Sequence, residues 1–158
     1  RRQRPVLLRN VGGKFRVATR QGGPYFEKEH PARGLALADV DNDGRIDAVV
    51  SQVNEPAAVL RNVADVGGNH WLGVELIGRG HADVVGAKVV LECGGRTQTR
   101  FAKGGGSYAS SPDRRLVFGL GAADRIDRLT VVWPDRTKQA WTDLLVDRYH
   151  PLTQGAGQ

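Results

Sequence analysis

The sequence predicts an all-β protein in which one propeller-blade-like antiparallel unit is followed by a β-sandwich-like domain. Strand-length apolar runs, many of them rich in Val, Ile and Leu, alternate with turn residues along the chain. The 21 glycines suit such a fold, because glycine adopts the positive φ angles that hairpins and bulges require. A helical stripe of 3.6-residue period does not extend over three turns anywhere in the sequence.

The predicted strands follow one another in chain order. Their ranges are 6–8, 35–38, 46–50, 58–60, 71–77, 87–91, 97–102, 116–118 and 129–133. The best helix candidate is the short stretch 141–148, because Pro151 would end a helix soon afterwards. After Gly67-Gly68 the strands become longer, and all three tryptophans follow. We therefore divide the chain into a first unit at 1–65, a second domain at 69–150 and a C-terminal tail at 151–158.

Composition excludes several classes of protein. With 40% hydrophobic and 25% charged residues, the chain has the composition of a soluble globular protein. Its apolar runs are far shorter than the roughly 20 residues of a membrane helix, so we expect no membrane span. The single cysteine, Cys93, excludes an internal disulfide. The four histidines of the chain are scattered and offer no zinc-ligand spacing. No apolar signal segment follows the opening arginines, and the abrupt start indicates a piece of something longer.

Positive charge is concentrated at the start of the chain. The net charge is +6, and residues 1–20 contain seven basic residues and no acid. Such a basic end is typical of a solvated tail or of an edge strand protected by charge, and it also permits binding of a polyanion. We expect no nucleic-acid partner, because no RNP, KH or helix-turn-helix pattern accompanies the arginines.

A short string occurs twice in the first unit, once near each end. Leu8-Arg9-Asn10-Val11 recurs as Leu60-Arg61-Asn62-Val63, an offset of 52 residues. This offset is close to the roughly 40–50 residues of propeller-blade repeats. The repeat therefore supports a blade-like unit, and we expect the remaining blades to come from the same protein or from another chain, because a single blade exposes both faces of its sheet.

An acidic motif between the two copies of the repeat has the pattern of a metal-binding loop. Residues 39–47 read DVDNDGRID, with aspartates at loop positions 1, 3, 5 and 9 and glycine at position 6. Calcium takes six to eight oxygen ligands, and alternating aspartates in a tight loop direct carboxylates inward. We therefore predict a Ca²⁺ site whose ligands are Asp39, Asp41, Asp43, Asp47 and the backbone carbonyl of Arg45. A metal-free Asn-Asp-Gly hairpin turn is the alternative.

The flanks of the motif distinguish it from an EF-hand. Position 12 is Val50 rather than glutamate, and strand-like runs precede and follow the loop. Residues 34–50 (GLALADVDNDGRIDAVV), followed by 60–62 (LRN), resemble the calcium half of an FG-GAP/VCBS-type β-propeller repeat. The resemblance implies a strand–loop–strand calcium site with a structural role.

The second domain resembles the ASPIC/UnbV family. The matching strings, in family order, are 69–76 (NHWLGVEL), 85–89 (VGAKV), 104–108 (GGGSY), 118–121 (FGLG) and 127–135 (DRLTVVWPD). This family follows FG-GAP/VCBS-type repeats at the C-terminal end of longer proteins. The resemblance implies an exported, non-catalytic protein and supplies no catalytic residues.

We therefore expect no enzyme here. Ser107, Ser110 and Ser111 lack a nucleophile elbow, and Cys93 beside Gly94-Gly95 is best interpreted as an inert buried thiol. The leading hypothesis is a calcium-binding extracellular adhesion or scaffold module, secreted, periplasmic or on the cell surface, at the C-terminal end of a larger β-propeller protein. Its protein or glycan partner is not identified. The alternatives are a carbohydrate-binding accessory domain of a secreted enzyme and a polyanion binder acting through its arginine-rich start.

Overall fold

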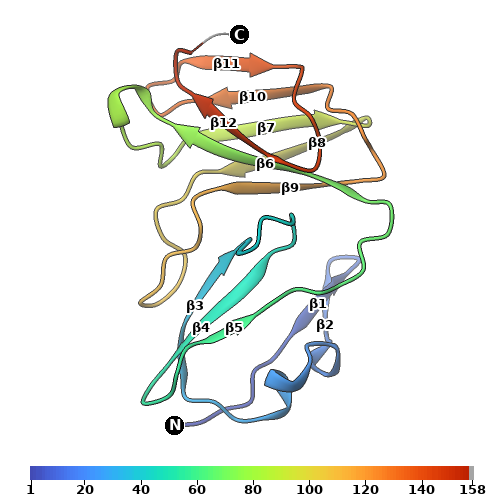
Figure 1. Ribbon diagram of the computed structural model, residues 1–158, viewed down its shortest axis with the longest axis vertical. Helices are drawn as coiled ribbons and strands as arrows, with labels where there is room; N and C mark the ends of the chain where they lie inside the picture. Colours follow the sequence, from blue (N-terminus) through green and yellow to red (C-terminus); the bar gives the residue numbers. More distant parts are fainter. Residues whose placement is uncertain (157–158) are drawn as a thin grey trace.

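A computed structural model describes residues 1–156 and confirms the all-β prediction. The described chain forms two units that lie one above the other along the long axis of the molecule (Figure 1). We call residues 1–65 the N-terminal unit and residues 69–156 the C-terminal unit. The only helical segments among the described residues are short 3-10 turns, none of which is long and apolar enough to cross a membrane.

The N-terminal unit contains a hairpin and a three-stranded sheet. The hairpin pairs β1 (Leu8–Val11) with β2 (Lys14–Val17) and leads into the 3-10 turns η1 (Thr19–Gln21) and η2 (Pro24–Glu27). The antiparallel sheet has the order β3-β4-β5, with bounds Ala32–Ala38, Asp47–Gln52 and Ala58–Leu60. The calcium-like motif connects β3 to β4.

The C-terminal unit is built from two sheets. Its strands are β6 (His70–Ile77), β7 (Lys88–Cys93), β8 (Arg96–Phe101), β9 (Leu116–Gly121), β10 (Arg128–Val132), β11 (Lys138–Trp141) and β12 (Tyr149–Thr153), with the 3-10 turn η3 (Arg79–His81) after β6. One sheet has the order β11-β10-β7-β8 and the other β12-β6-β9. Every pair is antiparallel except β12 with β6, which is parallel.

The hydrophobic core lies between these two sheets. Alternate residues of β7 and β10 point inward, including Leu91 and Leu129, each with no exposed surface. They meet Leu72 of β6 and Phe118 of β9 from the facing sheet, which are also fully buried. This alternation of buried and exposed positions is typical of packed β-sheets and accounts for the sandwich-like domain.

Two expectations for the C-terminal unit need correction. The boundary predicted at residue 150 falls inside β12, so residues 151–153 belong to a paired strand rather than a tail. Leu152 is only 4% exposed and joins the core, because β12 brings it against the sandwich. The stretch 141–148 forms no helix, and Trp141 belongs to β11.

The N-terminal unit has almost no core of its own. Val50 is its only buried hydrophobic residue among those described. Leu35 and Leu37 on β3, and Phe15 and Val17 on the hairpin, remain 44–75% exposed. The order of this unit therefore depends on backbone pairing, on the β3–β4 loop and on contacts with the C-terminal unit.

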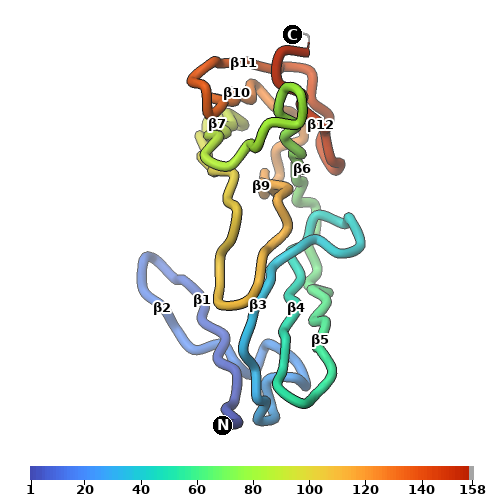
Figure 2. Tube along the Cα trace, turned by 90° about the vertical axis from the view of Figure 1, so that its left-hand side faces the viewer, coloured from blue at the N-terminus to red at the C-terminus, as the bar shows by residue number. Residues whose placement is uncertain are grey.

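A long connection between β8 and β9 lies beside the N-terminal unit. Figure 2 shows it descending from the C-terminal unit alongside β3. The amide of Asp113 donates a hydrogen bond to the carbonyl of Leu37 (2.9 Å), and Ser110 Oγ donates to the carbonyl of Leu35 (2.8 Å). The two units therefore meet along β3 as well as at the β3–β4 loop.

Candidate metal centre

The β3–β4 loop is folded around the side chain of Asp39. Asp39 Oδ1 accepts a hydrogen bond from the amide of Asp43 (3.0 Å), and Oδ2 accepts one from the amide of Gly44 (2.8 Å). Asn42 and Gly44 have φ angles of 60° and 83°, which bend the backbone back toward Asp39. Gly44 therefore occupies a position that residues with a β-carbon rarely adopt.

Three of the predicted ligands lie close together. Asp39, Asp41 and Asp43 each offer one carboxylate oxygen, and these oxygens all lie within 4.8 Å of one another. Two oxygens bound to the same Ca²⁺ at 2.3–2.6 Å can be at most about 5 Å apart. The spacing and the all-oxygen donor set therefore fit a hard divalent cation such as Ca²⁺.

Nearby arginines offset part of the negative charge. Asp41 is paired with Arg61, and Asp43 with Arg45. Asp39, at 1% exposure, is the most buried of the three carboxylates and has hydrogen-bond donors on both oxygens. An incoming cation would replace these guanidinium groups as the partner of Asp41 and Asp43, while Asp39 would stay fixed by the loop backbone.

The other two predicted ligands lie differently. Asp47, 2% exposed, accepts hydrogen bonds from the amide of Val40 (3.0 Å) on Oδ2 and from the amide of Asn62 (2.7 Å) on Oδ1. It thereby joins the start of the loop to the chain after β5, and it is not in the three-oxygen group. The amide of Arg45 donates to Asp43 Oδ1 (2.8 Å), which draws position 7 into the loop. Ligation by Asp47 and by the Arg45 carbonyl stays a prediction.

Two residues of the C-terminal unit reach the loop, and no sequence pattern indicates either contact. Tyr149 Oη donates a hydrogen bond to Asp39 Oδ2 (2.7 Å). Arg115 Nη2 donates to the Asp39 carbonyl (2.9 Å), and Nη1 donates to Asn42 Oδ1 (2.5 Å). Burial and the hydrogen bond to Asp39 raise the pKa of the Tyr149 phenol, so the phenol stays protonated and remains a donor at neutral pH. The hydrogen bond to Asp113 raises the pKa of Arg115, which keeps its positive charge.

A third contact comes from the start of β6. The ring of Trp71 lies against Gly44 and packs edge-on against Tyr149, with 5.1 Å between ring centroids. Asp147 fixes this strand end, because its carboxylate accepts hydrogen bonds from the Trp71 amide (3.1 Å) and from His70 Nδ1 (2.6 Å). The hydrogen bond from His70 lowers the pKa of Asp147. Trp71 thus packs at the junction of the two units.

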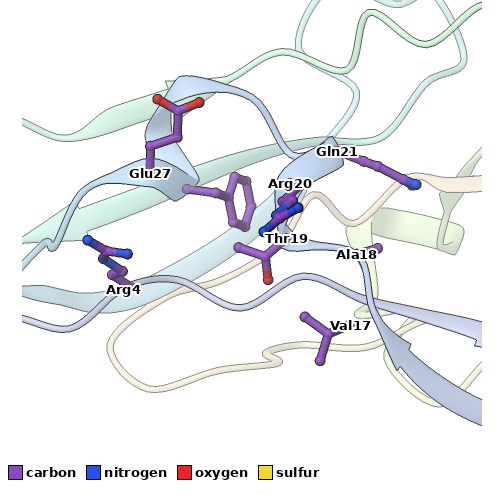
Figure 3. A pocket seen from close by; sticks show the side chains of 8 residues that line it. Arg4, Val17, Ala18, Thr19, Arg20, Gln21 and Glu27 are labelled. Atoms are coloured by element: carbon purple, nitrogen blue, oxygen red, sulfur yellow. The ribbon is translucent and has the colours of Figure 1, made fainter.

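The other candidates from the sequence lie away from this loop. Cys93 is buried, its Sγ contacts the carbonyl of Arg125 (3.1 Å), and burial raises its pKa. Ser110 and Ser111 donate to backbone carbonyls. An open hollow of about 820 Å³ beside η1 and η2 is bordered by Arg4, Arg20 and Glu27 among others (Figure 3). Both basic and acidic side chains line this hollow.

Comparison with known proteins identifies the C-terminal unit. The ASPIC and UnbV family model matches residues 78–158, about half of the chain, so the chain belongs to this family. Cartilage acidic protein 1 from Mus musculus is 32% identical over 135 residues, covering 77% of this chain and 21% of that protein. The Homo sapiens protein of the same name is 32% identical over 135 residues, covering 77% and 20%. The chain spans about a fifth of the length of these relatives.

Proposed function

We propose that this chain is a non-catalytic, calcium-binding scaffold segment of an extracellular protein. The observation that carries the proposal is the group of three carboxylate oxygens from Asp39, Asp41 and Asp43 within 4.8 Å, on a loop between two antiparallel strands. A bound cation would neutralise the repulsion between these carboxylates and so fix the loop. A structural role follows from the hydrogen bonds that tie the residues around the group to one another.

We further propose that the N-terminal unit is an FG-GAP/VCBS-type blade of a larger propeller. The repeated Leu-Arg-Asn-Val string supports this, because its offset of 52 residues is close to the roughly 40–50 residues of propeller-blade repeats. The exposure of Leu35, Leu37 and Phe15 supports it too, because further blades would cover such surfaces. The relatives, about five times longer than the matched part, have room for such blades.

The extracellular location and the lack of catalysis have separate support. The relatives are named after cartilage, which favours an extracellular setting for this chain as well. Millimolar calcium outside cells suits a site formed by one exposed loop, because extracellular calcium modules bind with dissociation constants of about 10⁻⁴–10⁻³ M. His70 and Asp147 form a histidine–carboxylate pair, an arrangement that can serve in catalysis. The Asp147 carboxylate also accepts a hydrogen bond from the Trp71 amide, which favours a structural role for this pair.

Thermal unfolding with and without calcium tests the proposal. Wild-type protein in about 5 mM CaCl₂ should unfold at a higher temperature than in EDTA, since a ligand at ten times its dissociation constant stabilises by about 1.4 kcal/mol. Asp41→Ala with Asp43→Ala should abolish the calcium-dependent increase. Asp124→Ala with Asp127→Ala, which removes two exposed carboxylates of the C-terminal unit, is the matched control and should keep it. An unchanged calcium response in the first double variant would exclude this loop as the site.

Polyanion binding is a second candidate, and one cross-strand pair favours it. Arg9 and Arg16 lie directly opposite each other in the β1–β2 hairpin, and Lys14 lies on the same face. Like charges in opposite positions destabilise a hairpin unless an anion lies between them. Arg9→Gln with Arg16→Gln should then shorten retention on a sulfated-polysaccharide column and reduce its salt dependence. Retention equal to that of wild type would remove this candidate.

A further inference from the structure

The calcium loop is also the place where the two units meet. Its Asp39 contacts Tyr149 and Arg115, and its Gly44 lies against Trp71, so the loop touches β6, β12 and the end of the β8–β9 connection. In Figure 1 the β3–β4 loop is the part of the N-terminal unit that reaches toward β9 and β6. A change in the conformation of the loop must therefore alter its contacts with residues of the C-terminal unit.

The Asp39 carboxylate is shared between the loop and the C-terminal unit. A carboxylate has about four lone-pair sites. Three are occupied by the amides of Asp43 and Gly44 and by the phenol of Tyr149. One lone-pair site is left for a cation, and the hydrogen bond from the phenol restricts the rotation of the carboxylate.

The groups that contact Asp39 are themselves held rigidly. Arg115 Nε donates to Asp113 Oδ2 (2.7 Å), and the guanidinium carbon lies 4.2 Å from the centroid of the Tyr149 ring. Gly73 makes room for that ring, because a β-carbon there would come within 2.3 Å of Tyr149 Cδ1. In the docked arrangement the phenol and the guanidinium are thus held in place by Gly73 and Asp113, two neighbours within the C-terminal unit.

We propose that Tyr149 and Arg115 are positioning residues of the calcium loop, so that calcium binding and docking of the C-terminal unit are energetically linked. This inference rests on the proposed calcium site. By linkage, if docking raises calcium affinity by some factor, calcium strengthens docking by the same factor. Tyr149 acts by orienting the Asp39 carboxylate, and Arg115 by fixing the Asp39 carbonyl and the Asn42 side chain. This linkage would hold the C-terminal unit rigidly on the N-terminal unit where calcium is abundant. Where calcium is scarce, the two units would dock more loosely.

Calorimetric titration of the full chain with calcium tests the proposal. Tyr149→Phe removes only the phenolic hydroxyl and should weaken calcium binding about tenfold, the lower end of what outer-shell partners of metal ligands contribute. Arg115→Lys keeps the charge but loses the planar fork, and it should weaken binding as well. Two matched controls should bind calcium as wild type does. These are Tyr108→Phe, at an exposed ring, and Arg114→Lys, at the neighbouring arginine whose partner is the exposed Asp83.

Amide hydrogen exchange supplies a readout that a merely structural role would not change. Calcium should increase the protection of the amides of Gly73 and Asp147, whose hydrogen bonds to Arg148 and Trp71 tie β6 to the start of β12. In Tyr149→Phe this calcium-dependent increase should disappear, whatever the protection in EDTA. Wild-type calcium affinity in both Tyr149→Phe and Arg115→Lys would overturn the inference and leave the calcium site standing. Absence of calcium binding in the wild type itself would overturn both.

Discussion

The indole of Trp71 lies directly against the backbone of Gly44. A β-carbon on Gly44 would come within 2.2 Å of Trp71 Cδ2, although the two residues belong to different units. The sixth position of the loop thus needs glycine for two separate reasons, its φ of 83° and the ring that covers it. This contact makes the loop part of the junction as well as a candidate for ion binding.

Gly44→Ala should therefore cost more than the same substitution at another left-handed glycine. Gly13 is the matched control, because its φ is 80° and nothing lies within 4 Å of the position of its β-carbon. Backbone strain alone should cost Gly13→Ala about 1–2 kcal/mol of unfolding free energy. Gly44→Ala adds overpacking against Trp71, for a total of about 2–5 kcal/mol. Urea unfolding measures both values, and equal losses would show that the Trp71 contact carries no energy.

Asp147 should make the protein more sensitive to acid. Its pKa lies below the ordinary 3.8, chiefly because of the hydrogen bond from His70, so the unfolded state takes up the proton first. The stabilisation is present above pH 3.8 and is lost as the pH falls from there through the lowered value. The melting temperature of wild type in EDTA should exceed that of Asp147→Asn at pH 6, and the two should converge as the pH falls below 3.8 through the lowered pKa of Asp147. Asp124→Asn, at an exposed aspartate, should show no such convergence, and a gap for Asp147→Asn that persists in acid would contradict the assignment.

Cys93 should be almost unreactive in the folded protein. Its side chain is 6% exposed, and burial raises the thiol pKa from its ordinary 9.0. Because the thiolate is the nucleophile, alkylation by iodoacetamide at pH 8 should be at least about 100-fold slower in buffer than in urea. Ser107→Cys in a Cys93→Ala background places a thiol at an exposed position and should react at nearly the same rate in both conditions. Fast labelling of native Cys93 would show that the end of β7 opens readily.

Most of the unfolding free energy should come from the packed core between the two sheets of the C-terminal unit. Leu91 is fully buried between the two sheets, and truncation of such a leucine typically costs about 2–5 kcal/mol. Leu91→Ala should therefore lower the midpoint of chemical unfolding strongly. Leu145→Ala changes a leucine that is 59% exposed and should alter unfolding free energy by less than about 0.5 kcal/mol. Similar losses from the two variants would contradict the position assigned to the core.

The sequence predicts those features that depend on local patterns. Alternation in segments such as 87–91 gives the inward Val89 and Leu91, and the DVDNDG string gives a tight loop with three converging carboxylates. Contacts between distant segments have no such pattern. The partner of Asp39 is Tyr149, 110 residues away, and no local pattern around residue 149 indicates a contact with the loop. The pairing of His70 with Asp147 is equally invisible for the same reason.

The C-terminal strand is hidden from sequence reasoning for a related cause. Pro151 would end a helix, yet it lies in β12 opposite Glu75. A proline lacks only the donor, so it is tolerated in a strand at the edge of a sheet, and β12 is such an edge. Its neighbour Leu152 is buried because parallel pairing with β6 directs it inward, a relationship that the short run Tyr149–Thr153 does not reveal by itself.

The parallel pairing of β12 with β6 also affects how the protein folds during its synthesis on the ribosome. Strand β6 is synthesised first among the sandwich strands, but the partner that closes its second edge is made last. Until that partner leaves the exit tunnel, the nascent chain carries an open, apolar strand edge and an aspartate loop that no tyrosine yet contacts. The unit thus completes its fold only after nearly all of it has been translated, which makes this interval the period when a chaperone would be needed most.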